Sequence, residues 1–551
     1  MVSVKEAITK PKAQKPTDTA KVQTTTIAQS PLYTPTTGTK AKPTKPAPKH
    51  QSIKTPSSIT KHLHKDQTKI PTARRQLKIT TSKQLKPRRS EISKILAQDK
   101  TTYKNPTDIT QAIKNNDIFP ANIPLKDDIG KLGLMWPRGK IANAHPAAKL
   151  LHEYSDFGCP LDCGPNWSLE QILTSIKRGP HISAKDPIAT QCLHKETQEK
   201  IQGGYARIVT WRELKHNMPT SLKISPVAMI PHKSRLYRCI LDLSFQIKVK
   251  GTKLKSVNGS TRSKAPQKSM AQLGKVLRRI LATMQQHYNT EMPFYFSKCD
   301  IKDGFWRMVV NAQDAWNFCY VLPPLNSTST HIDDTQIVVP HALQMGWSES
   351  PPFFCSASET ARDIIQTYMD TTTTLPEHQL ETHMYNNTTF SPTVKVTTNT
   401  TRLIDVYVDD FIAATNDNTK TNIIHMSRAM LHGIHSIFPP PEITKHNGGD
   451  PISEKKLQKL EGLWDTHKEI LGWNINGKDY TIQLPQEKQE KIQHLTNNIY
   501  RKKAVPLKQF QKLQGKLIHA SIGMPNGRGL LAPIYNAIKT ITMKSEQYKT
   551  D

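Results

Sequence analysis

The sequence predicts an α+β fold behind a basic N-terminal arm, and three observations support this prediction. Near Ser93 the composition changes from a Lys/Thr/Pro-rich segment with almost no aromatic residues to that of a globular protein. Apolar segments interrupted by turn residues, such as 227–245 and 403–414, are typical of paired strands. Segments with apolar residues at helical spacing, such as 166–178 and 350–369, lie between them. We therefore expect helices and antiparallel strands in several domains.

Residues 1–92 form the arm. The first 100 residues carry 22 Lys and Arg against 5 Asp and Glu. Such a segment cannot bury enough apolar area to offset its ordering entropy, so it is expected to be disordered. Its cluster KQLKPRRS (Lys83–Ser90) fits a nuclear import signal or an RNA-binding arm, and equally a solvated run of charge.

The charge of the whole chain indicates a polyanionic partner. The formal net charge is +32, which favours nucleic acid through phosphate contacts, although solubility alone is an alternative. No secretory signal and no run of about 18 apolar residues is visible, so no membrane partner is expected. We expect an intracellular protein, cytoplasmic or nuclear or both, that is not secreted. Among the seven cysteines, Cys159 and Cys163 could bind zinc, but without a second well-spaced pair a structural role is favoured.

The first globular region, 93–219, is predicted to be mostly helix and loop. Within it, Asn166–Arg178 has a good helix start, because Ser168 can cap the helix and Gln171 follows three residues later. The next region, 220–290, contains a strand, a basic turn and a second strand, followed by a Lys-rich loop.

The third region, 291–485, carries most of the strands. Residues 294–323 predict a strand, a short helix and a strand, and 350–369 predict an amphipathic helix. The Thr/Asn-rich segment 371–401 is expected to be a surface insertion without regular structure. A hairpin and the strand pair around 471–484 follow, and the last region, 486–551, is predicted to be helical.

Three carboxylates stand out. In VYVDDFIAAT, Asp409 and Asp410 lie between two apolar arms, and Asp300 ends the apolar strand of FYFSKCDIKDGFWRMVV. Ionised carboxylates in apolar surroundings repel each other and lose hydration, and a divalent cation between them relieves both costs. Oxygen ligands of this kind suit Mg²⁺. A solvated Asp-Asp turn is the alternative for the hairpin.

These motifs resemble those of reverse transcriptases, most closely the retrotransposon type. YVDD looks like the Y-x-D-D motif of that family, and CDIKDGFW is similar to its first palm motif. LQMGWSESPPFF, PVAMIPHKSRLYRCILDLS, EILGWNINGKDYTIQLP and LQGKLIHASIGMPNGRGLLAPIY resemble further blocks, which occur in family order between about 226 and 535. The resemblance implies a right-hand polymerase with fingers in 220–290, a palm in 291–485 that includes the insertion 371–401 and the primer-grip hairpin, and the start of a thumb and connection in 486–551.

The resemblance also implies an active site with two Mg²⁺ ions, for which Mn²⁺ is a possible substitute. Asp300 and Asp409 would be the main metal ligands, with Asp410 adjacent and the carbonyl of Ile301 as a further ligand. Residues expected to contact the incoming deoxynucleoside triphosphate are Lys233, Arg238, Asp303, Gly304, Phe305 and Met345. Phe305 matches the bulky aromatic that excludes a ribose 2′-hydroxyl, with core packing as the alternative. Arg235 competes with Lys233, and Asp242 either orients the hairpin or only ends a strand.

A second set of residues is expected to hold an RNA or DNA template and its primer. Its members are Tyr407, Gly346, Trp347, Leu471, Gly472, Trp473, Lys508, Lys512 and Lys516. Trp473 could stack on the primer or pack in the core. The three lysines recur every four residues on one helical face, so they form a basic stripe that can follow a duplex backbone or be merely solvated. Lys508, Lys512 and Lys516 together form this basic stripe.

The resulting hypothesis is a retroelement reverse transcriptase. Only 16 residues follow Tyr535, so no ribonuclease H domain is expected within this sequence. One alternative is an RNA-dependent RNA polymerase, which Phe305 and Tyr407 argue against. The other is an inactive retroelement-derived protein that only binds nucleic acid, which the presence of all three aspartates argues against.

Overall fold

The computed structural model describes residues 137–551, except 233–234, 247, 250, 254, 291, 326–330, 391–399, 442–447, 503, 525 and 551. The predicted arm, 1–92, and the beginning of the helical region therefore lie outside the described residues. Within the described part of the chain, no helix is both long enough and apolar enough to cross a bilayer.

The described part of 93–219 is mainly helical, as expected. Its α-helices are α4 (Gly139–Asn143), α5 (Ala148–Phe157), α6 (Leu169–Arg178), α7 (Pro187–Gln202) and α8 (Trp211–Leu214), with the short 3₁₀ helix η2 (Ile182–Ala184). The cap predicted for α6 is confirmed, because the Ser168 side chain accepts from the Gln171 amide and the Gln171 side chain accepts from the Ser168 amide. The prediction missed strand β1 (Ala206–Thr210), which pairs with a strand more than 100 residues further along the chain.

The hairpin predicted in 227–245 is confirmed. Strands β2 (Val227–Pro231) and β3 (Tyr237–Leu241) pair antiparallel, with Ile230 opposite Arg238. The following segment holds β4 (Lys248–Val249), β5 (Thr252–Lys253), α9 (Val257–Ser260), η3 (Gln267–Lys275), α10 (Val276–Gln286) and η4 (Tyr288–Thr290).

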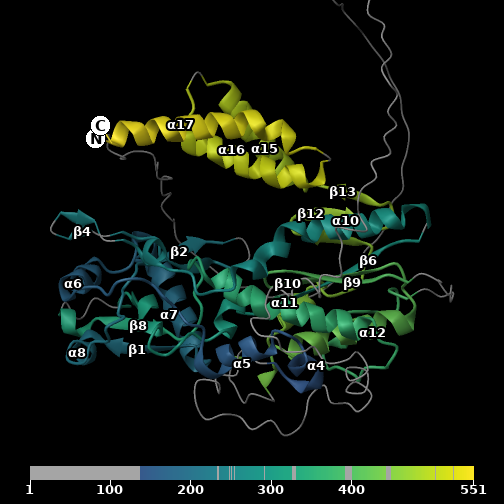
Figure 1. Cartoon of the computed structure of the whole chain (residues 1–551), viewed down its shortest axis with the longest axis horizontal. Coiled ribbons are helices and arrows are strands. Elements are labelled where there is room, and N and C mark those ends of the chain that lie inside the picture. The colour runs from purple at the N-terminus through teal and green to yellow at the C-terminus, as the bar shows by residue number, and fades with distance from the viewer. Residues whose placement is uncertain are drawn as a thin grey trace, which may run out of the picture. The chain divides into compact units, whose positions relative to one another are not determined.

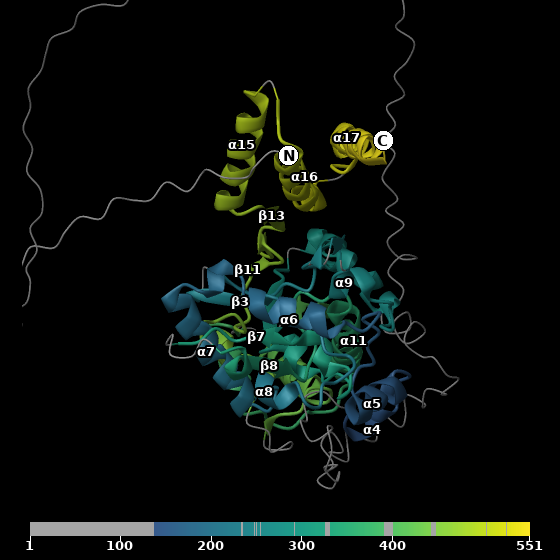
Figure 2. The same ribbon diagram turned by 90° about the vertical axis from the view of Figure 1, so that its left-hand side faces the viewer.

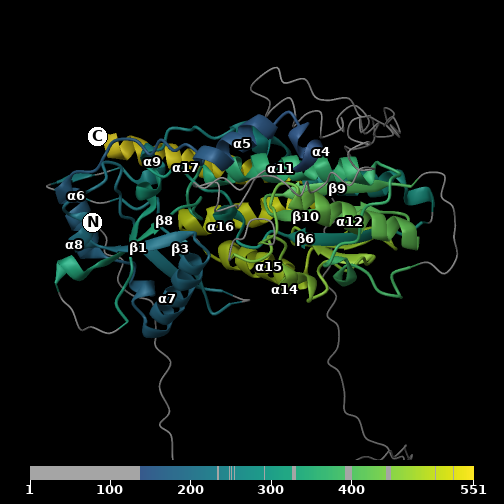
Figure 3. The ribbon, with the colours of Figure 1, turned by 90° about the horizontal axis from the view of Figure 1, so that it is seen from below.

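The central sheet has the order β6–β10–β9, and all its strands are antiparallel. Its strands are β6 (Tyr295–Asp300), β9 (Arg402–Tyr407) and β10 (Asp410–Thr415). Helices α11 (Ser350–Met369) and α12 (Lys420–His435) lie side by side against one face of this sheet (Figure 1, Figure 3).

Alternation along β10 explains how both faces of the sheet are buried. Phe411 and Ala413 belong to the larger apolar core, which includes α11 and α12. Ile412 and Ala414 belong to a second core, formed with α10 and with strands that follow in the sequence. Because successive side chains of a strand point to opposite faces, these two sets must separate. The sheet that carries the three aspartates is therefore held from both sides.

Helix α11 begins and ends where the sequence predicted, but it is not amphipathic. Eighteen of its 20 residues are buried, polar ones such as Glu359 and Asp363 among them. The prediction was wrong about its polar face, because that face packs against other elements. Asp363, for example, binds His145 at 3.2 Å from the N-terminal region.

Further short elements surround the central sheet. They are η5 (Gly304–Arg307), η6 (Ala315–Phe318), β7 (Tyr320–Val321), η7 (Ile332–Asp334), β8 (Gln336–Pro340), η8 (Glu381–His383) and α14 (Glu454–Leu457). The β1–β8–β7 sheet joins two of the predicted regions. The described part of 371–401 consists of turns and η8, so the expected lack of regular structure is confirmed, but the expectation that it lies on the surface is wrong. Leu375, Leu380 and Met384 are buried in the larger apolar core, and Glu381 pairs with Arg428 of α12.

The last elements are a small sheet and a set of helices. The sheet has the order β11–β12–β13, formed by β11 (His467–Ile470), β12 (Trp473–Asn476) and β13 (Thr481–Gln483). The helices are α15 (Gln486–Tyr500), α16 (Leu507–Ala520), η9 (Ser521–Gly523), η10 (Gly529–Leu531) and α17 (Ala532–Thr550). Helix α16 packs against both α15 and α17 (Figure 2).

Candidate active site

The structure brings the three predicted carboxylates together at one end of the central sheet. Asp410 begins β10 and lies directly opposite Asp300, the last residue of β6. Cα atoms of such antiparallel partners are about 5 Å apart. The Asp409 carbonyl accepts a hydrogen bond of 3.0 Å from the Ile301 amide, which fixes the turn against the strand.

The turn between β9 and β10 is tight. Val408 has a φ of 59°, a left-handed conformation that is rare for a β-branched residue. It allows the chain to reverse between Tyr407 and Asp410, which pair with each other across the hairpin. The alternative of a solvated Asp-Asp turn is disfavoured, because the turn is hydrogen-bonded to the residue that follows β6 and lies next to the carboxylate of Asp300.

Burial and nearby negative charges raise the pKa values of the three carboxylates. Burial and the negative charges of Asp300 and Asp410 raise the pKa of Asp409 from 3.8 to about 6. Burial likewise raises the pKa of Asp410 to about 6, against the opposing effect of Lys298. Burial also raises the pKa of Asp300, which its ion pair with Lys456 opposes. Clustered carboxylates with raised pKa values mark functional-site candidates.

Two lysines that the sequence analysis did not single out lie beside these carboxylates. Lys456 of α14 is 2.7 Å from the Asp300 carboxylate, and Lys298 of β6 is 4.0 Å from that of Asp410. Lys298 is the one charged residue before Asp300 in β6, a signal that could have identified it. No local pattern singles out Lys456, which meets Asp300 only through the fold.

The donor chemistry fits hard divalent cations, although the geometry is not that of a filled site. Within the described ranges, no group of three His, Cys, Asp or Glu side chains is already arranged to hold a metal ion. Asp300 is instead engaged by Lys456, whose ammonium neutralises part of the cluster. Three crowded carboxylates are nevertheless oxygen ligands of the kind that suits Mg²⁺.

The segment that follows β6 approaches the cluster closely. A Cβ atom placed on Gly304 would lie 3.5 Å from Cβ of Asp409 and 3.3 Å from the Phe354 ring. Phe305 is partly buried, and its ring meets Phe354 edge-on at 5.6 Å. Phe305 thus packs on α11, and it is also partly accessible beside Gly304, so its surroundings fit both core packing and a contact with substrate.

Arg307 anchors the end of this segment. Its buried guanidinium donates to the backbone carbonyls of Lys302, Gly448, Gly449 and Asp450 at 3.1–3.4 Å. The chain just beyond also supports β6, because the Ser453 amide donates to the Asp300 carbonyl at 2.9 Å.

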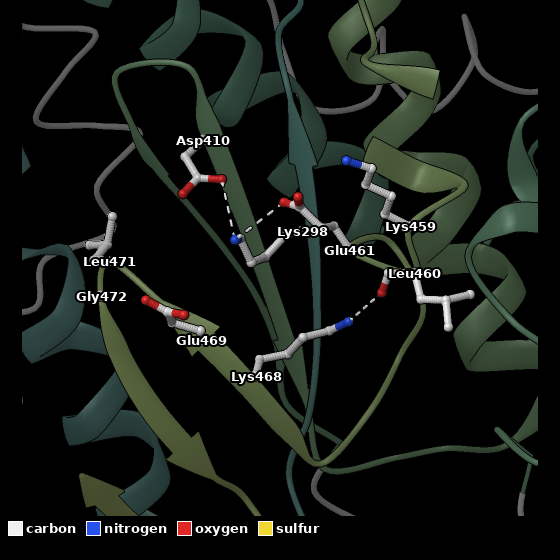
Figure 4. Close-up of a pocket in the computed structure, with 9 residues that line it drawn as sticks. All are labelled: Lys298, Asp410, Lys459, Leu460, Glu461, Lys468, Glu469, Leu471 and Gly472. Atoms are coloured by element: carbon white, nitrogen blue, oxygen red, sulfur yellow. Dashed lines mark hydrogen bonds and ion pairs between the residues drawn. The ribbon is translucent and has the colours of Figure 1, made fainter. Parts of the chain in front are cut away.

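A small cavity connects the cluster to the turn between β11 and β12. It has a volume of about 400 Å³ and is lined by Asp410, Lys298, Glu461, Leu471 and Gly472 among others (Figure 4). In Figure 4, Lys298 lies between Asp410 and Glu461, while Leu471 and Gly472 lie across the cavity. The structure thus places the predicted primer-grip turn beside a predicted catalytic carboxylate.

Both predicted tryptophan contacts are buried. Trp347 is 3% exposed and stacks on Phe353, and its indole donates to the Thr261 hydroxyl at 3.1 Å. Trp473 is 5% exposed and packs against His519. Their burial corrects the expectation of direct contact with primer or template: in this arrangement both tryptophans pack the core, which decides the open choice for Trp473.

Their neighbours are more accessible. Gly346 is exposed, with a φ of 105°. A Cβ there would lie 2.5 Å from the Leu241 carbonyl oxygen, so this turn touches the base of the β2–β3 hairpin. Met345 is partly buried, and Tyr407 is 42% exposed at the end of β9.

The residues predicted on the β2–β3 hairpin are only partly described. Lys233 lies outside the described residues. Arg238 is partly buried on β3, which packs against α7. Arg235, the competitor of Lys233, is exposed just before β3. Asp242 caps the following turn, where its carboxylate accepts from the Ser244 amide at 3.1 Å, consistent with a structural role.

The basic stripe occupies one face of α16. Lys508 and Lys512 are exposed and Lys516 is partly exposed, and within the described part of the chain no ion pair is found for these three lysines. Leu513 is buried on the other face of the helix. Burial and the positive charges of Lys488 on α15 and Lys516 lower the pKa of His519, which lies on the same helix as the stripe.

Comparison with known proteins does not assign this chain to a family. No family model matches the sequence, and no curated protein matches it. The solved structures to which this chain is similar include the foamy viral protease-reverse transcriptase dRH in complex with double-stranded DNA, at 17% identity and a TM-score of 0.36. That match covers 79% of this chain and 59% of the other.

A second solved structure is the foamy viral protease-reverse transcriptase in complex with double-stranded DNA, at 15% identity and a TM-score of 0.38, covering 82% of this chain and 66% of the other. The chain therefore spans about six-tenths of the length of these two structures.

Proposed function

We propose that this chain is an RNA-directed DNA polymerase of a retroelement, which adds deoxynucleotides to a primer 3′-end and releases pyrophosphate. The observation that carries the proposal is the pairing of Asp300 with Asp410 across two strands, with Asp409 in the adjoining turn. Three carboxylates from segments more than 100 residues apart have no structural need to meet at the end of a sheet. Their mutual repulsion costs stability, which Lys456 offsets in part at Asp300 and bound divalent cations would offset further.

Asp300 and Asp409 would hold two Mg²⁺ ions, with Asp410 and the Ile301 carbonyl nearby, and Mn²⁺ as a possible substitute. Bound there, the ions would lower the pKa of the primer 3′-hydroxyl and neutralise charge on the triphosphate. The protein's own contribution is to hold the carboxylates on a sheet packed on both faces, so that little reorganisation is needed.

The surrounding residues bind and orient the substrates in this proposal. The backbone of Asp303 and Gly304 lines the sugar and triphosphate, with Arg238, Lys233 and Met345 in the nucleotide set. Phe305 excludes a 2′-hydroxyl. The division into fingers, palm and thumb at 220–290, 291–485 and 486–551 belongs to the same proposal.

The primer terminus would enter the cavity between Asp410 and the Leu471–Gly472 turn (Figure 4). Tyr407 and Gly346 would contact the template-primer from the accessible surface. The basic stripe would contact the phosphate backbone without reading sequence. An intracellular location, cytoplasmic or nuclear, follows as part of this proposal, because templates and nucleotides are found there.

Primer extension tests the proposal directly. The full chain should extend oligo(dT) on poly(rA) with Mg²⁺ or Mn²⁺, and Asp409→Asn should lose extension while it keeps nucleic-acid affinity. Glu153→Gln on the exposed side of α5 is a matched control that removes a carboxylate far from the cluster in sequence. Equal extension by wild type and Asp409→Asn would remove the site assignment.

Two alternatives are separated by the same assay. An RNA-dependent RNA polymerase would incorporate ribonucleotides efficiently as the wild type, without any change at Phe305. A protein that only binds nucleic acid would retain the template-primer but extend it with neither metal.

A further inference from the structure

Lys200 is a buried cation next to the segment that leads into Phe305. It lies near the end of α7, and its side chain is only 9% exposed. Its ammonium is 2.7 Å from the Asp303 carboxylate, which is 30% exposed. A lysine is rarely buried to this extent unless it is paired, so the ion pair accounts for its position.

Aromatic rings complete the environment of Lys200. The ammonium lies 5.3 Å from the centre of the Trp306 ring and 5.5 Å from that of Tyr205. Both distances are within the range of cation–π attraction. Lys200 therefore contacts residues on both sides of the Gly304–Phe305 pair, through Asp303 before it and Trp306 after it.

The backbone of this segment depends on the contact. Asp303 has φ 58° and ψ 35°, a left-handed conformation that costs an ordinary residue free energy but that Asp tolerates. The 2.7 Å ion pair with Lys200 holds the Asp303 side chain in this conformation. The Asp303 carbonyl then accepts from the Trp306 amide at 2.8 Å, which closes the turn around Phe305.

The partners of Lys200 extend toward the β2–β3 hairpin. Glu196 lies one turn earlier on α7. Burial raises the pKa of its carboxyl group, the charges of Lys200 and Arg235 oppose that rise, and the charge of Asp303 adds to it. Helix α7 also packs against β3, the strand that carries Arg238. Lys200 thus lies where the hairpin, α7 and the Phe305 segment meet.

We propose that Lys200 is a positioning residue for sugar selection, which fixes the turn 303–306 so that Phe305 stands where a 2′-hydroxyl would lie. This inference rests on the proposed polymerase function. Lys200 does not itself touch the nucleotide, because its ammonium is covered by Asp303, Tyr205 and Trp306. It acts through the orientation of Phe305.

The test compares the ratio of kcat/KM for a deoxynucleotide to that for the matching ribonucleotide in the purified full chain. Lys200→Met should lower this ratio about tenfold, because small displacements of a positioning group have effects of that order. Lys200→Arg should restore most of the ratio, since a guanidinium can pair with Asp303 and stack on Trp306. Lys195→Met, which removes an exposed lysine from the same helix, should leave the ratio unchanged.

A double substitution separates positioning from general damage. In a Phe305→Ala background, Lys200→Met should cause no further loss of discrimination, because the residue through which Lys200 acts is gone. If Lys200→Met does not fold, Asp303→Asn removes the same ion pair and keeps a residue that tolerates the left-handed backbone, and the same loss is expected.

The outcomes are distinguishable. A wild type that extends primers with a ratio unaffected by Lys200→Met or Asp303→Asn overturns this inference and leaves the proposed function standing. Further loss from Lys200→Met in the Phe305→Ala background also overturns it, because Lys200 then acts by another route. A wild type that extends no primer overturns the proposed function and this inference with it.

Discussion

Replacing Asp409 with Asn should stabilise the metal-free protein while it abolishes primer extension. The carboxylate has an ordinary pKa of 3.8 and a pKa of about 6 in the folded protein, because of burial and the charges of Asp300 and Asp410. For an isolated group this difference corresponds to about 3 kcal/mol at neutral pH. The repulsion is shared by three carboxylates, and Asn leaves a partly buried amide, so we expect a gain of about 1–2 kcal/mol.

The pH dependence gives this prediction its sign. Because the pKa is raised on folding, the folded state binds the proton more tightly than the unfolded chain. The stability from this group is fully present below pH 3.8 and is lost as the pH rises through about 6. Asp409→Asn should therefore exceed the wild type in stability at pH 7.5, and the advantage should fade as the pH approaches 4.

Thermal unfolding in a chelator, followed by circular dichroism at pH 7.5 and pH 4.5, measures the effect. We expect a rise in Tm of about 1–2 °C for Asp409→Asn at pH 7.5. Added Mg²⁺ should raise the Tm of the wild type more than that of the variant, because binding to the folded state stabilises it. Glu153→Gln should show neither effect. A lower Tm for Asp409→Asn at pH 7.5, with no dependence on pH, would refute the repulsion on which the argument depends.

The remaining predictions concern packing, backbone, sugar selection and the basic stripe. Arg279→Met should destabilise the protein by about 3–5 kcal/mol in chemical denaturation, because it leaves the fully buried Asp405 without the guanidinium that binds it at 2.6 and 2.8 Å; a cost below about 1 kcal/mol would contradict this. Gly346→Ala should lower the Tm and weaken binding of the template-primer, since its Cβ would lie 2.5 Å from the Leu241 carbonyl oxygen, and an unchanged Tm would show that the turn can relax. Phe305→Ala should increase ribonucleotide incorporation while deoxynucleotide incorporation persists; unchanged selectivity would assign the ring to core packing. Changing all three lysines of the basic stripe to Ala should reduce the slope of log K against log salt for duplex binding by about 2–3, and an unaltered slope would mean that they are merely solvated.

Local pattern was sufficient where short-range chemistry decides the outcome. The capping box at Ser168 and Gln171 and the hairpin containing Asp409 and Asp410 are encoded within a few residues, and both occur where expected. The meeting of Asp300 with that hairpin was also predicted, although composition and spacing alone do not imply it; the expectation came from the resemblance of several motifs to a known family.

What the sequence did not reveal depends on contacts between distant segments. Lys200 meets a residue 103 positions later, and Lys456 meets one 156 positions earlier, so no periodicity could pair them. Burial of both faces of α11 is likewise a property of its neighbours and not of its own pattern. The burial of Trp347 and Trp473 also depends on distant contacts. From the sequence alone, a tryptophan beside a glycine turn is equally compatible with a binding surface and with a core.

Arg307 has a consequence for how this chain can vary. Its guanidinium donates only to main-chain oxygens of residues 302 and 448–450 in these hydrogen bonds. A substitution at those positions therefore removes no side-chain acceptor. Substitutions at those positions should be tolerated if the backbone conformation is unchanged. A substitution of Arg307 removes all of these hydrogen bonds at once. In a survey of random substitutions, variants that still fold should therefore carry changes at residues 302 and 448–450 more often than at Arg307.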